Sequence, residues 1–352
     1  MRDALGRARR GDFSVSDETQ AQIEALFKTT TWGFREIMLV VVVGRLLDDG
    51  YRPGKALYDC NPRALYEGPI LGVLRGEGIP ARKSGPLNIA KAAQGLSREW
   101  AAQRRPKSVA DEVVRLVQAI EGMDQTELEE FSAALHARFL KEASRVAALS
   151  VTAPPESDPQ HLYEICAELI DKVPDGGNTP QRIVGHLMEA YHTELQTGIV
   201  VTGHLDRASV TSTTSKKPGD INEEQADGTV LCVYEVTVKP FGGARTVDSY
   251  ETVKRYSTGK ASPIREVVVI CRPADVHPGI ESGSRASAIY LGKLEHQDLT
   301  YHFINIYEWI VAQLSRMPVD ARLSFHQQLS EYITDPNTSE AVKKRWADLV
   351  AP

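Results

Sequence analysis

Two acidic residues and a lysine in the second half of the chain have the types and spacing that phosphodiester hydrolysis requires. Asp220 follows a Pro-Gly turn, and Glu235 and Lys239 come fifteen and nineteen residues later, in an apolar stretch. Two carboxylates bind Mg²⁺, and a nearby ammonium group stabilises the negative charge that develops on a phosphate. Although an aspartate after a turn is by itself an ordinary turn residue, the combination predicts a metal-dependent hydrolytic site.

The stretch 230–238 is rich in valine and is expected to form a strand. Successive side chains of a strand point to opposite faces, so Glu235, Thr237 and Lys239 share one face. The other face is expected to lie in the core and carries Cys232, Tyr234, Val236 and Val238. Charged side chains on a buried strand are costly unless they are paired or bind something. The alternative is an edge strand whose charged face is solvated.

The segments Pro218-Gly219-Asp220 and Glu235-Val236-Thr237-Val238-Lys239 resemble the motif of the PD-(D/E)xK nuclease superfamily, which includes most type II restriction endonucleases. The resemblance covers roughly residues 178–271. It implies that Asp220, Glu235 and the backbone carbonyl of Val236 bind Mg²⁺, while Lys239 stabilises charge. That superfamily also places a glutamate on the helix before the first strand. Glu189 takes that place here and is expected to orient a second ion or a water molecule.

The spacing of the lysine departs from the family pattern, in which it follows the acid by two residues. Lys239 follows Glu235 by four, which is about 13 Å along a strand. In one interpretation Glu235 binds the metal, Thr237 stands at the usual lysine position and Lys239 contacts phosphate. In the other, Thr237-Val238-Lys239 is the acid-x-lysine motif without its acid, and Glu235 or Glu251 supplies the missing carboxylate.

The pattern of apolar and turn-forming residues predicts two domains of the α/β (α+β) class. Residues 1–150 are expected to form a helical domain that binds DNA, with one helix over 17–47. A linker rich in proline covers 151–159, and residues 160–352 are expected to form the catalytic domain, a restriction-endonuclease-like mixed sheet flanked by helices. Its expected strands are 199–201, 230–238, 267–271 and 288–291, and its expected helices include 181–196, 246–256 and 301–314.

Basic residues gather in one part of the first domain, although the whole chain has a net charge of −6. Seven cationic residues and one acid occur between positions 82 and 107. Such a cluster suits contacts with the phosphates of DNA, and a solvated helix face is the alternative. The residues expected to contact DNA are Arg82, Lys83, Lys91, Arg104 and Arg105, together with Lys216 and Lys217 beside Asp220.

The remaining composition excludes several classes of protein. The four cysteines are scattered, so they predict neither a zinc site nor a disulfide framework, and Cys232 and Cys271 are expected to be buried. The spacing of His186, His192 and His204 likewise does not predict a zinc site. No apolar stretch is long enough to cross a membrane. We therefore expect a cytoplasmic protein.

These observations together favour a Mg²⁺-dependent, sequence-specific endonuclease that cuts double-stranded DNA as a homodimer. Cutting two strands at a symmetric site favours a two-fold protein. A repair nuclease or a nuclease that depends on modified DNA stays open as an alternative. So does a non-catalytic DNA-binding protein that has kept the sheet and lost the chemistry, or an interaction module whose charged strand is merely exposed.

Overall fold

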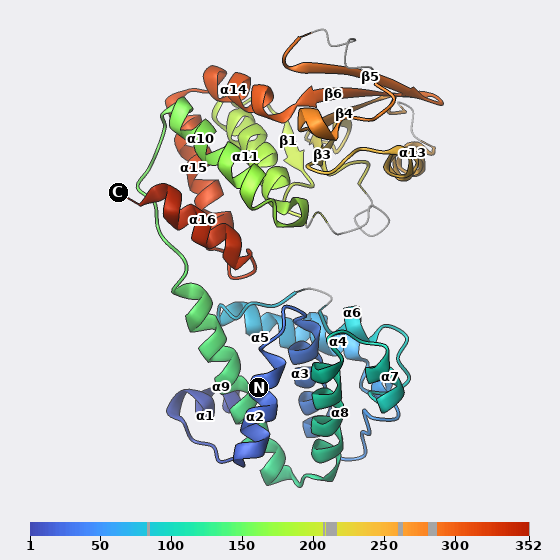
Figure 1. Ribbon diagram of the computed structural model, residues 1–352, viewed down its shortest axis with the longest axis vertical. Coiled ribbons are helices and arrows are strands. Elements are labelled where there is room, and N and C mark those ends of the chain that lie inside the picture. Colours follow the sequence, from blue (N-terminus) through green and yellow to red (C-terminus); the bar gives the residue numbers. More distant parts are fainter. Residues whose placement is uncertain (83–84, 207, 209–216, 260–262, 281–286, 352) are drawn as a thin grey trace. The chain divides into compact units, whose positions relative to one another are not determined.

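The chain forms two compact units, Met1–Ala148 and Leu149–Pro352 (Figure 1). In the part of the chain that the structure describes, the first unit has one hydrophobic core and the second has two. The computed structural model describes residues 1–82, 85–206, 208, 217–259, 263–280 and 287–351. Lys83 and Lys216, both expected to contact DNA, lie outside these residues. The expected linker over 151–159 begins just after the boundary between the units.

The first unit is helical in its described residues. Its α-helices are α1 (Arg2–Arg10), α2 (Asp17–Leu26), α3 (Gly33–Leu47), α4 (Pro62–Leu65), α5 (Leu71–Gly76), α6 (Gly85–Ala90), α7 (Arg98–Ala102), α8 (Lys107–Gly122) and α9 (Gln125–Ala147), with short turns η1 (Leu57–Cys60) and η2 (Tyr66–Ile70). α3 packs against α6, α8 and α9. The side chains from Ile37 to Val42 have no exposed surface, which explains the apolar run in this part of the sequence.

The single helix expected over 17–47 is wrong, because α2 ends at Leu26 and α3 begins at Gly33. Three threonines, Thr29 to Thr31, occupy the break. The backbone N–H of Thr31 donates to the hydroxyl of Thr29 at 3.1 Å. A threonine hydroxyl that satisfies nearby backbone groups competes with the helical hydrogen bonds, so the helix stops there.

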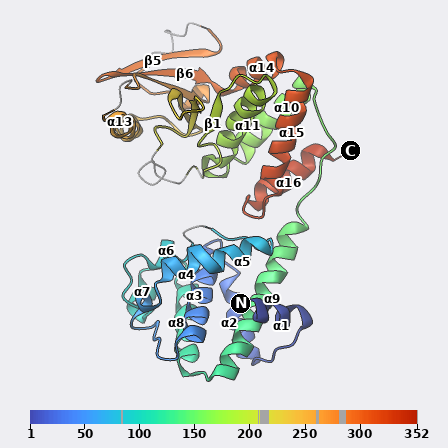
Figure 2. The ribbon, with the colours of Figure 1, turned by 180° about the vertical axis from the view of Figure 1, so that it is seen from behind.

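The second unit contains a six-stranded mixed sheet with helices on both faces (Figures 1 and 2), which confirms the predicted α/β class. Its helices are α10 (Pro159–Lys172), η3 (Asp175–Gly177), α11 (Asn178–Glu194), α13 (Gly243–Ser257), η4 (Pro273–Asp275), α14 (Ile306–Arg316), α15 (Val319–Thr334) and α16 (Glu340–Val350). Its strands are β1 (Val200–Thr202), β2 (Ile221–Glu224), β3 (Val230–Thr237), β4 (Glu266–Cys271), β5 (Tyr290–His296) and β6 (Leu299–Asn305).

The strand order in the sheet is β1-β2-β3-β4-β6-β5. β1, β2 and β3 form an antiparallel meander, while β3, β4 and β6 run parallel to one another. Two parallel neighbours need a crossover connection, and α13 provides it between β3 and β4. The carboxyl end of β3 is thereby brought next to the amino end of α13.

The two faces of the sheet belong to different cores. Val236 and Ile270 pack on one face with α10, α11, α14 and α15. Val233 and Val269 pack on the other face with Val253 of α13. Because side chains alternate along β3, Glu235 lies on the face that α13 covers.

The sequence predictions failed at three elements of the second unit. The helix expected over 301–314 begins only at Ile306, and Leu299–Asn305 is strand β6. Alternate residues of β6 are buried, which is a period of two that the aromatic residues obscured. β2 was missed because it is only four residues long and, with two glutamates, lacks an apolar pattern. The last expected strand, 288–291, lies two residues early, because β5 begins at Tyr290.

Two of the side chains expected in the core of the second unit are not fully buried. Cys232 is exposed, contrary to the prediction. Tyr234 is half-buried and donates a hydrogen bond to Glu223 at 3.0 Å. Cys271 is buried, as expected. Over the described part of the chain, every helix is too short or too polar to cross a membrane.

Candidate functional site

Asp220 and Glu235 lie beside each other, Asp220 directly before β2 and Glu235 on the neighbouring strand β3. The register pairs Ile221 with Tyr234. The backbone N–H of Val236 donates to Oδ2 of Asp220 at 3.0 Å. This contact fixes the Asp220 carboxylate against the end of β3, next to Glu235.

Arg245 of α13 binds both carboxylates through a single nitrogen. Its Nη2 lies 3.4 Å from Oδ2 of Asp220, 3.2 Å from Oε2 of Glu235 and 3.3 Å from the carbonyl oxygen of Val236. Three oxygens from two strands therefore surround one cationic atom. They come from the same three groups that the family resemblance implies as Mg²⁺ ligands.

The two acids differ in their surroundings. Glu235 is 9% exposed, and its Oε1 accepts a hydrogen bond from the hydroxyl of Ser249 at 3.1 Å. Asp220 is partly buried, with 26% of its side chain exposed, and it faces the negative charge of Glu235. Burial first, and Glu235 second, raise the pKa of Asp220 to about 7, while Arg245 and the Val236 N–H act in the opposite direction. Near pH 7 the Asp220 carboxyl is therefore partly protonated even beside Arg245, and a bound metal ion would displace that proton.

Thr237 occupies the position two residues after Glu235 and binds Arg245. Nη1 of Arg245 donates to the Thr237 hydroxyl at 2.7 Å. β3 ends at Thr237, so Lys239 lies beyond the strand and is exposed, and it does not continue the face of Glu235 as expected. The hydroxyl of Thr237 also bonds the backbone N–H and carbonyl of Lys239, at 3.1 and 2.8 Å, which turns the chain out of the sheet. Glu251, the alternative acid, is exposed on α13.

Glu189 is separated from this group of residues. It projects from α11, which packs on the opposite face of the sheet from α13. Among the described residues, its polar partners are His186 and His204. Its expected role beside Asp220 is therefore not supported by a contact.

A glycine and a glutamine hold the backbone of Asp220 in place. Gly203, just after β1, has a φ of +91°, and a Cβ there would lie 2.4 Å from the Asp220 carbonyl oxygen. The side chain of Gln181 on α11 donates to the carbonyls of Gly203 and Asp220 at 3.1 and 3.4 Å. Close approach of this kind requires a residue without a side chain at position 203. Lys217 binds Asp206 at 3.1 Å in the same region.

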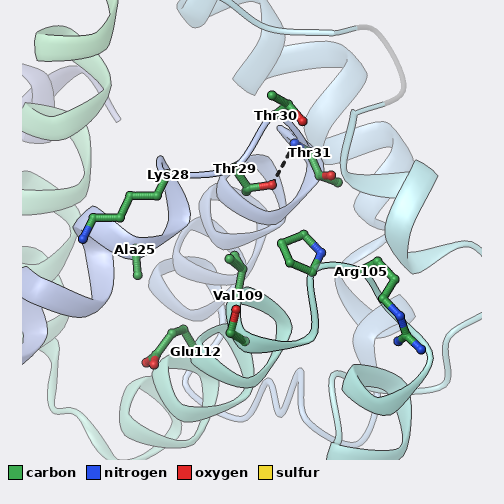
Figure 3. A pocket seen from close by; sticks show the side chains of 10 residues that line it. Ala25, Lys28, Thr29, Thr30, Thr31, Arg105, Val109 and Glu112 are labelled. Carbon is green, nitrogen blue, oxygen red and sulfur yellow. Dashed lines mark hydrogen bonds between the residues drawn. The ribbon is translucent and has the colours of Figure 1, made fainter.

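The basic residues of the first unit are exposed to different degrees. Arg82 and Lys91 are exposed, and the guanidinium of Arg82 lies over the ring of Trp32. Arg104 is half-buried over Trp100. Arg105 lines a hollow of about 860 Å³ with Lys28 and Glu112. Figure 3 shows Lys28 and Arg105 on opposite sides of this hollow.

No family model matches this chain, and no curated protein is significantly similar to it.

Sequence reasoning brought Asp220 and Glu235 together but overlooked Arg245 and Ser249. A signal for Arg245 exists in the sequence. It lies two residues after Gly242-Gly243, at the start of the helix that follows β3. A cation at that place faces the carboxyl end of the preceding strand, which is where the acids lie.

Proposed function

We propose that this protein is a Mg²⁺-dependent DNA endonuclease of the restriction type, with its active site at Asp220 and Glu235. The observation that carries the proposal is the convergence of Asp220 Oδ2, Glu235 Oε2 and the Val236 carbonyl on one cationic atom. Hard oxygens from two carboxylates and a carbonyl suit Mg²⁺. When bound, the ion would polarise the phosphate and lower the pKa of water.

The chain's own residues have separate roles in this proposal. Asp220 and Glu235 hold the ion, and Ser249 orients Glu235 through its hydrogen bond. Arg245 neutralises the acids in the metal-free protein. Because a second cation at the same oxygens would repel it, the guanidinium would then turn toward the phosphate. Arg245 thus supplies the positive charge that the family takes from its lysine, with Lys239 as an outer phosphate contact.

The surrounding elements support the same assignment. The resemblance implies one helix before the first strand and another that flanks the site, and α11 and α13 have these positions in the chain. For the substrate we propose double-stranded DNA, cut by a homodimer in the cytoplasm. The exposed side chains of Arg82, Lys91 and Arg105, together with the half-buried Arg104, provide the positive charge for phosphate contacts.

A second candidate function is favoured by the same Arg245. If the guanidinium keeps its place permanently, the acids are already neutralised, and Thr237 stands where the family has its lysine. The protein would then be a non-catalytic DNA-binding protein on a nuclease-like sheet. The two candidates differ in whether Mg²⁺ binds to the acids.

Incubation of phage and plasmid DNA, methylated and unmethylated, with Mg²⁺ or EDTA tests the proposal. We expect discrete fragments whose formation requires Mg²⁺. Their rate of formation should fall by about 10²–10³-fold in Asp220→Asn, because the variant loses a carboxylate ligand of the ion that would stabilise the transition state. Glu224→Gln is the matched control, since Glu224 lies on β2, the strand that Asp220 directly precedes, and binds Thr202 instead. Equal cleavage by Asp220→Asn and the natural protein would refute the active-site assignment, and intact DNA in every lane would favour the non-catalytic protein.

A further inference from the structure

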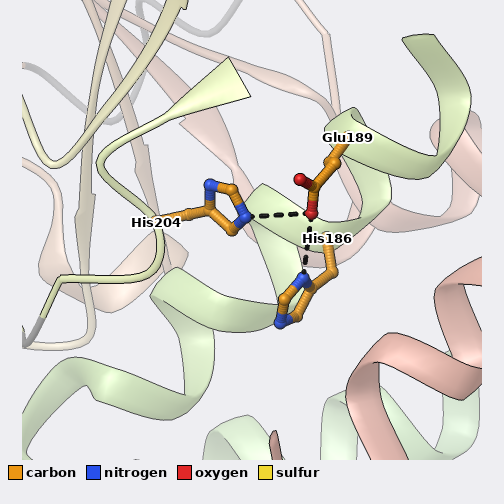
Figure 4. A group of neighbouring side chains, drawn as sticks. All are labelled: His186, Glu189 and His204. Atoms are coloured by element: carbon orange, nitrogen blue, oxygen red, sulfur yellow. Dashed lines mark hydrogen bonds and ion pairs between the residues drawn. The ribbon is translucent and has the colours of Figure 1, made fainter. Parts of the chain in front are cut away.

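A second group of polar side chains lies on the other face of the sheet from the acids. His186 and Glu189 are one turn apart on α11, and His204 lies in the turn after β1 (Figure 4). Oε2 of Glu189 is 3.1 Å from Nε2 of His204 and 3.5 Å from Nδ1 of His186. The three ligand atoms all lie within 4.8 Å of one another. Both imidazoles thus point at one carboxylate oxygen.

The two histidines of this group are buried, and their hydrogen bonds are incomplete. His186 is 5% exposed and His204 is 1% exposed. Nδ1 of His186 faces Glu189 without forming a hydrogen bond, and Nε2 of His186 and Nδ1 of His204 also have no partner. Buried polar atoms are nearly always satisfied in native proteins. The position of His186 Nδ1, which faces the Glu189 carboxylate without a hydrogen bond, is explained if an ion binds between the two side chains.

The chain makes room for this arrangement at Gly185. A Cβ at position 185 would lie 2.1 Å from Cβ of His204. The absence of a side chain therefore lets His204 rest directly on α11. The rings of His186 and His204 meet edge to face with their centres 5.2 Å apart.

The ligand types and distances indicate which ion would bind. Ligand atoms 2.0–2.1 Å from a tetrahedral Zn²⁺ are separated from one another by about 3.4 Å. The two contacts of Glu189, 3.1 and 3.5 Å long, are close to this separation. Two imidazoles and one carboxylate select a zinc-like transition metal over Mg²⁺, which prefers oxygen ligands.

We propose that His186 Nδ1, Glu189 Oε2 and His204 Nε2 bind one divalent transition-metal ion of the zinc class, at a site separate from the acid pair. The ion fastens α11 to the turn after β1, whose Gly203 lies against the Asp220 carbonyl. It therefore stabilises the segment that leads into the proposed active site. This inference does not depend on nuclease activity, and it revises the expectation from sequence spacing that the histidines form no zinc site.

The test measures metal binding by the full chain without an affinity tag. A chelator first removes bound metals, and Zn²⁺ or Co²⁺ is then added back. We expect one equivalent of Zn²⁺ by mass spectrometry, and an intense visible spectrum of tetrahedral type when Co²⁺ replaces it. Glu189→Gln and His204→Asn should each weaken binding by about 100-fold or more, because even an outer partner of a metal ligand contributes 10–100-fold. Glu189 is one-third exposed, so its amide variant decides the outcome if His204→Asn fails to fold.

Two control variants show whether the ion depends on these three residues in particular. His192→Gln removes a buried histidine of the same helix that binds Thr197 and Glu223 instead, and it should keep the ion. Asp220→Asn should also keep it, whether or not the nuclease proposal holds. The proposal is overturned if the natural protein binds no ion, if both ligand variants bind as well as it does, or if the Co²⁺ spectrum is octahedral and disappears with Asp220→Asn. In the first case the three residues form only a metal-free hydrogen-bonded network.

Discussion

The chemistry proposed for this protein depends on how one aspartate gains and loses a proton. Asp220 has a pKa raised to about 7 by burial and by Glu235. A divalent ion and a proton compete for its carboxylate. We therefore expect the affinity for Mg²⁺ or Mn²⁺ to fall by about tenfold for each pH unit below 7 and to level off above it. Titration calorimetry between pH 5.5 and 8.5 measures this, and an affinity independent of pH would contradict the proposed ligand.

The same pKa shift sets the sign of the pH effect on folding in the metal-free protein. The carboxyl ionises near 3.8 when unfolded and near 7 when folded. Between these values the folded state binds more protons, so the free energy of unfolding falls as pH rises and then levels off above about 7. Asp220→Asn should remove this contribution, and denaturant unfolding at several pH values with and without the substitution shows whether it does.

Replacing Arg245 tests whether Mg²⁺ can take the place of its guanidinium at Asp220 and Glu235. Arg245→Met leaves Asp220 and Glu235 facing each other without a counter-charge, so at pH 8 without metal we expect a loss of about 1–3 kcal/mol of stability. Mg²⁺ should restore much of this loss. Arg272→Met is the control, since Arg272 pairs with Asp275 and the Val238 carbonyl and should lose stability that Mg²⁺ does not restore. Thermal unfolding in Mg²⁺ and in EDTA compares them, and equal responses would favour the non-catalytic protein.

At the scale of elements, the site depends on how closely the turn after β1 approaches the start of β2. Gly203→Ala combines a positive φ with a Cβ only 2.4 Å from the Asp220 carbonyl, so we expect a loss of about 1–3 kcal/mol and weaker Mn²⁺ binding. Gly243→Ala on α13 has no atom within 4 Å of its new Cβ and should change neither property. Denaturant unfolding and Mn²⁺ titration measure both, and a neutral Gly203→Ala would show that this approach does not position Asp220.

The sequence predicted those elements whose apolar pattern was strong. β3 has valine at three of its eight positions, β4 carries a run of three valines, and α11 and α13 have helical spacing. β2 was not predicted, because a four-residue strand that pairs with a neighbour on each side needs no apolar pattern of its own. β6 was taken for the start of a helix because Tyr301 and Phe303 run directly into α14.

The candidate site was predictable in part, for a similar reason. Asp220 and Glu235 are joined by strand pairing, which a turn and a strand in the sequence suggest. Arg245, and the contact of His204 with α11, depend on packing between elements. Spacing along the chain carries no information about such contacts. The alternation that placed Lys239 with Glu235 failed because the strand ends at Thr237.

At the scale of the whole molecule, two units contribute different properties. The helical unit provides the exposed cations that are proposed to contact DNA. The described residues of the sheet unit contain both the acid pair, Asp220 and Glu235, and the His186-Glu189-His204 group. A net charge of −6 gives no general attraction to DNA. Binding of DNA by the whole chain would therefore depend on local positive charge in the first unit.

The central claim is that Asp220, Glu235 and the Val236 carbonyl hold a divalent ion, and a crystal structure of the full chain soaked in Mn²⁺ tests it most directly. The anomalous signal of Mn²⁺ locates the ion without reference to activity. We predict a peak bonded to these three oxygens, with the Arg245 guanidinium displaced from them. Arg245 still bound to both carboxylates, with no Mn²⁺ between Asp220 and Glu235 at saturating concentration and pH 8, would contradict the claim.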